Sequence, residues 1–147
     1  MINLLLWLSL LVSDMNKIRD LFISASEDES KNIELLNLTQ GYTVDYSPVV
    51  YAYHAAAEMI MAKHVILPTS KLSFFNSGKK KLEMVINRYP NLVEIRYIRY
   101  AVQKGAPSFL DYQANMSEDR KFVLANYKKM NWSKTFKSTV FEVVKEK

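Results

Sequence analysis

The chain has 147 residues, a formal net charge of +5 and no cysteine. Without cysteine it can form no disulfide, no thiolate zinc site and no cysteine nucleophile. Three glycines and four prolines are fewer turn residues than an all-β fold needs, so we expect an all-α fold. The length fits one domain with a core of its own.

The first 13 residues have two competing interpretations. Residues 4–12 are apolar and are followed by Ser13 and Asp14, which is typical of a signal peptide with the mature chain starting near Asp14. However, no Lys or Arg precedes this run, and apolar residues recur at steps of three and four as far as Phe22, which indicates the first half of a packed N-terminal helix. The first interpretation places the protein in the cell envelope or outside the cell, and the second in the cytoplasm. In both, the run is about half the ~20 residues of a membrane span, so no transmembrane anchor is expected.

In the first half of residues 14–147, the sequence pattern predicts two helices. Residues 27–29 are acidic and open a helix that ends before Gly41, and we interpret them as first-turn charge rather than a docking patch. Ser47 and Pro48 are a cap and a first-turn proline for the next helix, over residues 49–65. Because this segment is rich in alanine and methionine, we expect it to be the most buried helix.

His54 and Glu58 lie four residues apart in that second helix and therefore on one face. This spacing occurs in helical metal sites, but two ligands do not form a site and no further His, Asp or Glu cluster is positioned to complete it. We therefore expect His54 to be a hydrogen-bonded residue of the interior or its boundary, and we expect no metal and no cofactor.

Residues 70–105 predict two helices that fold back on each other as a hairpin. Apolar residues recur at helical spacing from Leu72 to Tyr89, Pro90 ends the first helix, and Gly105 closes the second. Ser70 or Thr69 can cap the start. Gly78 lies on the apolar stripe, where it costs about 1 kcal/mol relative to alanine. We expect close approach of another helix backbone to compensate for this cost.

The spacing of Gly78, Leu82, Val85 and Pro90 resembles the second helix of a tetratricopeptide repeat. The surrounding run is also similar to a group of small, uncharacterised bacterial helical proteins of that plan, over residues 47–130. The resemblance implies antiparallel helical hairpins packed as a degenerate, α-solenoid-like domain of about six helices. It also implies binding rather than catalysis. The chain has no second copy of the repeat at a fixed period.

Three segments follow the predicted hairpin. Residues 108–115 predict one helical turn and a loop, with Phe109, Leu110 and Tyr112 covering the end of the hairpin. Ser117 is the expected cap of the next helix, which Asn131 ends. Residues 133–147 have helically spaced apolar residues and predict a last helix.

Positive charge is concentrated in the second half of the chain. Residues 1–70 have a balance of −4 and residues 71–147 one of +9, which suggests attraction between the halves or an anionic partner for the second. The candidate binding residues combine basic and tyrosine side chains: Lys79, Lys80, Lys81, Arg96, Tyr97, Arg99 and Tyr100. Arginines beside tyrosines can bind phosphates and stack on bases. The alternative, which we favour, is one solvated arginine stripe and one half-buried tyrosine stripe on a packed helix.

The sequence has no motif for catalysis. It has no glycine-rich phosphate loop, no nucleophile elbow and no His-Glu-Xaa-Xaa-His helix. Carboxylates from distant helices, such as Asp45 with Glu58 or Asp111, could pair only in the folded protein. We therefore expect a protein- or peptide-interaction module and not an enzyme, with nucleic-acid or anionic-surface binding as the alternative.

Overall fold

The computed structural model describes residues 4–145, with side chains from residue 14 onward. This part of the chain forms helices only, without strands. The seven α-helices are α1 (Leu4–Ala25), α2 (Glu29–Thr39), α3 (Pro48–His64), α4 (Pro68–Arg88), α5 (Val93–Gly105), α6 (Met116–Asn126) and α7 (Lys134–Val144). Two short 3-10 helices are η1 (Ser108–Leu110) and η2 (Tyr127–Lys129). The predicted all-α class is confirmed, and so is the last predicted helix.

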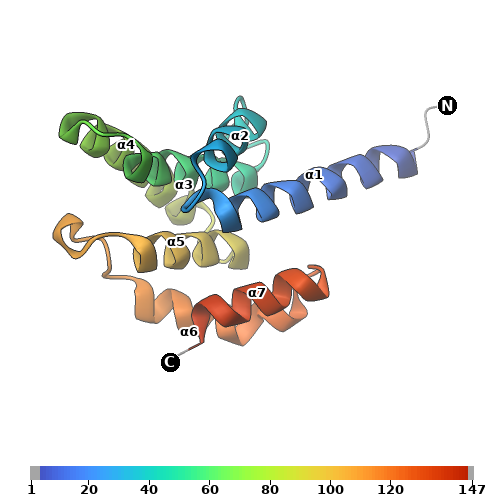
Figure 1. The fold of residues 1–147 in the computed structure, drawn as a ribbon. Helices are drawn as coiled ribbons and strands as arrows, with labels where there is room; N and C mark the ends of the chain where they lie inside the picture. The colour runs from blue at the N-terminus through green and yellow to red at the C-terminus, as the bar shows by residue number, and fades with distance from the viewer. Residues whose placement is uncertain (1–3, 146–147) are drawn as a thin grey trace.

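Helix α5 lies between two layers of helices (Figure 1). Helices α3 and α4 cover one side of it, α6 and α7 cover the other, and α1 and α2 pack against α3. Nine of the 13 residues of α5 are buried, compared with nine of 17 in α3. The prediction that α3 is the most buried helix is therefore wrong, because helices of both layers cover α5.

Gly78 marks a close approach of two helix backbones. A Cβ atom here would lie 2.9 Å from the backbone nitrogen of Met59 and would collide with the carbonyl oxygen of Ala55. Both residues belong to α3, so the predicted approach exists but its partner is α3 and not α5. The predicted hairpin of residues 70–105 is wrong on this point. Small alanines on α3 let α4 come close, while the break at Pro90 turns α5 toward other neighbours.

Three predicted helix starts are confirmed by their side-chain caps. The Ser47 hydroxyl accepts a hydrogen bond from the backbone nitrogen of Val50, and the Ser133 hydroxyl accepts one from Phe136. Asp28 accepts from the backbone nitrogen of Ser30 at 2.9 Å, so this acidic cluster serves the start of α2. Gly41, just past the end of α2, has a φ of 84°.

Two other helix starts differ from the prediction. Helix α4 begins at Pro68 with Leu67 before it, so neither Thr69 nor Ser70 caps it. Pro68 suits the first position because the amide hydrogen that it lacks would have no partner there. Helix α6 begins at Met116, one residue before the expected cap Ser117.

Helix α1 runs without a break through residues 13 and 14. Its second half packs on the body through Ile18, Leu21 and Phe22, which are buried. The side chains of residues 4–13 lie outside the described part, so the choice between signal peptide and packed helix stays a prediction. None of the described helices has the length and apolar character needed to cross a membrane.

Candidate functional site: an apolar groove

The arginines that the sequence placed on a solvated stripe lie inside the protein. Arg96 is 7% exposed and Arg99 is 5% exposed, and Tyr97 and Tyr100 beside them are also buried. The expected solvated stripe is therefore wrong. The reason is that α6 packs over this face of α5 and brings a buried carboxylate, Asp119, to the arginines.

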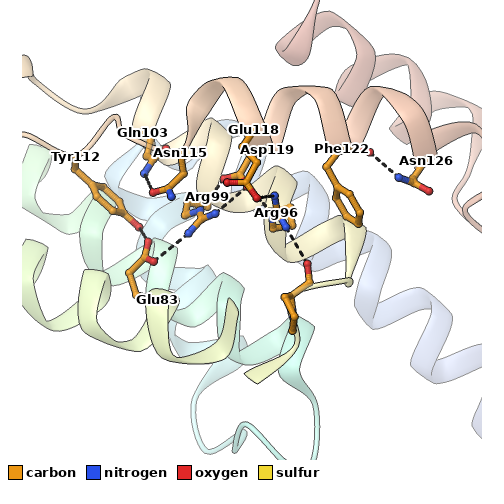
Figure 2. A network of polar contacts seen from close by, with 11 residues as sticks. Glu83, Arg96, Arg99, Gln103, Tyr112, Asn115, Glu118, Asp119, Phe122 and Asn126 are labelled. Carbon is orange, nitrogen blue, oxygen red and sulfur yellow. Dashed lines mark hydrogen bonds and ion pairs between the residues drawn. The ribbon is translucent and has the colours of Figure 1, made fainter. Parts of the chain in front are cut away.

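Asp119 pairs with both guanidinium groups, as Figure 2 shows. Its carboxylate accepts from the Nε of Arg99 at 2.6 Å and from the Nη2 at 2.8 Å, and it also accepts from the Nε of Arg96. Glu83 accepts from the Nη1 of Arg99 at 3.0 Å, and Glu118 accepts from the Nη2 of Arg96 at 3.0 Å. These contacts neutralise both positive charges and join α4, α5 and α6.

The three candidate lysines on α4 point to different surroundings. The Nζ of Lys79 lies 4.8 Å from the ring centre of Tyr112, Lys80 is exposed, and Lys81 forms an ion pair with Glu58. Thus the seven candidate binding residues do not form one surface. A binding role for the lysines stays a prediction.

His54 belongs to a small polar cluster between α2, α3 and α4. Its Nδ1 lies 2.9 Å from the Thr39 hydroxyl, and its Nε2 lies 3.4 Å from a Glu58 carboxylate oxygen that also pairs with Lys81. Burial lowers the pKa of His54, although the charge of Glu58 acts in the opposite direction. No group of three or more His, Asp or Glu that could hold a metal ion occurs among the described residues.

A large groove opens between the ends of several helices and has a volume of about 750 Å³. The second half of α1, the end of α3, the start of α4, the end of α5, η1 and α7 all contribute to it. Most lining side chains are apolar, and they include Phe22, Met59, Ile60, Phe75, Ala101, Val102, Leu110 and Val143.

Three large apolar side chains of the groove are exposed to solvent. Ile23 is 46% exposed, Leu72 is 50% exposed and Phe109 is 81% exposed. The prediction that Phe109 covers the end of the hairpin is therefore wrong, although Tyr112 is buried as expected. Next to the groove, Ile66 and Leu67 in the α3–α4 connection are also exposed. Such a concentration of exposed apolar surface is a feature of interaction sites.

Lys63 and Lys71 are the charged residues of the groove lining. The Nζ of Lys71 donates to the carbonyl oxygen of Ala62 at 3.2 Å, which leaves two of its three donors for other partners. The Nζ of Lys63 donates to the Ser26 hydroxyl and lies 3.5 Å from the carboxylate of Glu27. No Asp or Glu lines the groove within residues 14–145, so its polar edge is positive.

No protein-family model, no curated protein and no solved structure matches this chain. The groove could not be predicted from the sequence because its lining comes from six separated segments. One local signal was present in residues 65–67, where three apolar residues fill a connection between two helices.

Proposed function

We propose that this domain is a peptide-interaction module whose groove binds an amphipathic helix of a partner protein. The partner helix carries apolar residues on one face and acidic residues beside that face. The observation that carries the proposal is the groove itself, with an apolar lining and two lysines as its charged residues.

Size and chemistry both support a helix as the occupant. Ligand sites commonly have volumes of about 300–1,000 Å³, and the value of about 750 Å³ lies in this range. Amphipathic helices bind apolar grooves through anchors at positions i, i+3 or i+4, and i+7. A small polar substrate would need several convergent polar groups. The groove supplies few such groups besides Lys63 and Lys71.

The lysines support an acidic partner. Glu27, which lies near Lys63, has a side chain that is 87% exposed, so this surface pair contributes little. Carboxylates of a bound helix would therefore find two ammonium groups that are only weakly engaged. This charge complementarity favours one orientation of the partner and raises its association rate.

The test is a titration with three designed helical peptides that share one apolar face. One has glutamates beside that face, one has lysines there, and one is a scramble of the first. We expect the glutamate peptide to bind more tightly than the lysine peptide and the scramble not to bind. The double variant Lys63→Glu/Lys71→Glu should reverse the preference between the two charged peptides. No binding, or a preference that the double variant leaves unchanged, would refute the proposal.

A matched pair of substitutions on α4 locates the binding surface. Leu72 lines the groove and is 50% exposed, whereas Met84 lies away from it and is 45% exposed. We expect Leu72→Asp to weaken binding about tenfold or more, because a charge then faces the apolar side of the peptide. Met84→Asp should leave the affinity unchanged. Equal effects of the two substitutions would place the peptide elsewhere.

A further inference from the structure

A second surface with uncompensated charge lies at the corner where α6, η2 and α7 meet. From residue 121 to residue 141 the sequence has five lysines and no Asp or Glu. In Figure 1 this segment runs along the lower edge of the molecule, turns at η2 and returns as α7. We call the part from Tyr127 to Lys137 the basic corner.

The lysines of the basic corner differ from the arginines of α5, because within residues 14–145 they have no ion pair. Lys129 and Lys134 are exposed. The Nζ of Lys128 lies 6.0 Å from the Tyr127 ring centre, and the Nζ of Lys137 donates to the carbonyl oxygen of Lys128 at 2.9 Å. Four positive charges are thus held within a short stretch of surface.

The basic corner lies beside the path of α1. The guanidinium of Arg19 stands 4.8 Å from the ring centre of Phe136, and that ring lies 5.0 Å from the ring of Trp132. From this contact, α1 continues toward the N-terminus and leaves the body on the side where η2 and the start of α7 lie (Figure 1). The first half of α1 and the basic corner therefore lie at the same end of the molecule in this view.

The sequence of this first half of α1 is apolar. Residues 4–12 contain no charged side chain and include Trp7, and Asp14 is the first charged residue of the chain. As a helix these nine residues are about 14 Å long, too short to cross a bilayer of about 30 Å but long enough to lie in its interface. Tryptophan is enriched at that interface.

We propose that this end of the protein binds the surface of an anionic lipid bilayer. Residues 4–12 insert into the interfacial region, and Lys128, Lys129 and Lys134 face the phosphates and carboxylates of the lipid headgroups. Stable binding to a membrane surface generally needs two such contributions, one apolar and one basic. A nucleic acid would use the lysines but not the apolar helix, so a membrane fits both features. The groove lies at the opposite end of α5 and stays open.

The test uses the full chain and vesicles of phosphatidylcholine with or without phosphatidylserine. We expect binding to the anionic vesicles that weakens as salt is added, and much weaker binding to the neutral ones. The variant Lys129→Gln/Lys134→Gln should lose about tenfold or more in affinity. Lys31→Gln/Lys80→Gln removes two exposed lysines of other surfaces and should change little. Equal affinity for the two vesicle types, or equal losses in the two variants, would overturn the proposal.

Tryptophan fluorescence tests the apolar contribution. The chain has two tryptophans, Trp7 and the buried Trp132. In the variant Trp132→Phe, we expect brominated lipids in anionic vesicles to quench Trp7. In Trp7→Phe, the remaining Trp132 should stay unquenched. Unquenched Trp7, equally strong binding to single-stranded DNA, or a native protein whose first residue is Asp14 would each overturn the proposal.

Discussion

The guanidinium of Arg19 forms a bidentate ion pair with the carboxylate of Glu94, at 2.8 and 2.9 Å, across 75 residues of sequence. The Tyr53 hydroxyl donates to the same carboxylate at 2.7 Å. This contact joins α1, α3 and α5. The substitution Arg19→Gln would leave the carboxylate buried without its counter-charge, and we expect it to lower the free energy of unfolding by about 3–5 kcal/mol. Urea unfolding followed by circular dichroism measures the loss.

Lys17 provides the control on the same helix. It pairs with Glu34 at 2.8 Å, but the two side chains are 56% and 42% exposed. Exposed pairs contribute little to stability, so Lys17→Gln should lower the free energy of unfolding much less than Arg19→Gln does. If the two substitutions cost the same, the pair of Arg19 and Glu94 does not stabilise the fold as described.

Asp119 and Glu118 are neighbours with opposite surroundings. The Asp119 side chain is fully buried between two arginines, whereas that of Glu118 is 71% exposed. We expect Asp119→Asn to lower the free energy of unfolding by about 3–5 kcal/mol. The reason is that Arg96 and Arg99 then lose the buried carboxylate that lies between them. Glu118→Gln should cost less than about 1 kcal/mol. Thermal or urea unfolding of both variants checks this, and a small effect of Asp119→Asn would contradict it.

Gly78 and Gly105 are both helical, but only Gly78 meets a neighbour. A Cβ at Gly78 would collide with the backbone of α3, whereas one at Gly105 would find nothing within 4 Å. We expect Gly78→Ala to destabilise the fold by about 1–3 kcal/mol because α3 and α4 must separate. Gly105→Ala should be neutral or stabilise by up to about 1 kcal/mol. Differential scanning calorimetry compares them, and a stabilising Gly78→Ala would disprove the close approach.

His54 should make stability depend on pH. Burial lowers its pKa below the ordinary value of 6.5, so the unfolded chain takes up this proton more readily than the folded protein. The contribution of neutral His54 to the free energy of unfolding is complete above about pH 6.5. It is lost as the pH falls toward the lower pKa that His54 has in the folded protein. One proton limits the slope to about 1.4 kcal/mol per pH unit.

The measurement for His54 is urea unfolding at several pH values between about 7.5 and 5.5. Loss of stability on acidification should be smaller in His54→Gln than in the unchanged protein. Only the slope matters here, because the substitution also alters the hydrogen bond with Thr39. Parallel slopes in the two proteins would show that His54 has the same pKa in both states.

Buried ion pairs explain why part of the candidate site could not be predicted. Arg96 and Arg99 are three residues apart, and this spacing is also typical of an exposed helix face. Their burial depends on Asp119, whose position opposite them is fixed only when α6 folds over α5. The groove has the same origin, since Phe22, Leu72, Val102 and Val143 come from four different helices. The tetratricopeptide-like character of the packing stays a prediction.

The sequence by itself determined the elements, because the causes of each are local. Apolar spacing, Pro90 and the cap Ser47 act within one helix turn or a few, and they predicted the all-α class and most helix ends. Tertiary structure alone decided the partners of each helix. Gly78 indicates that another helix backbone lies close but does not specify which helix. In the structure this helix is α3, whose small alanines allow the approach, and not α5. The packing energy between helices depends on shape and charge over the whole core. The spacing of residues within one helix carries no information about these.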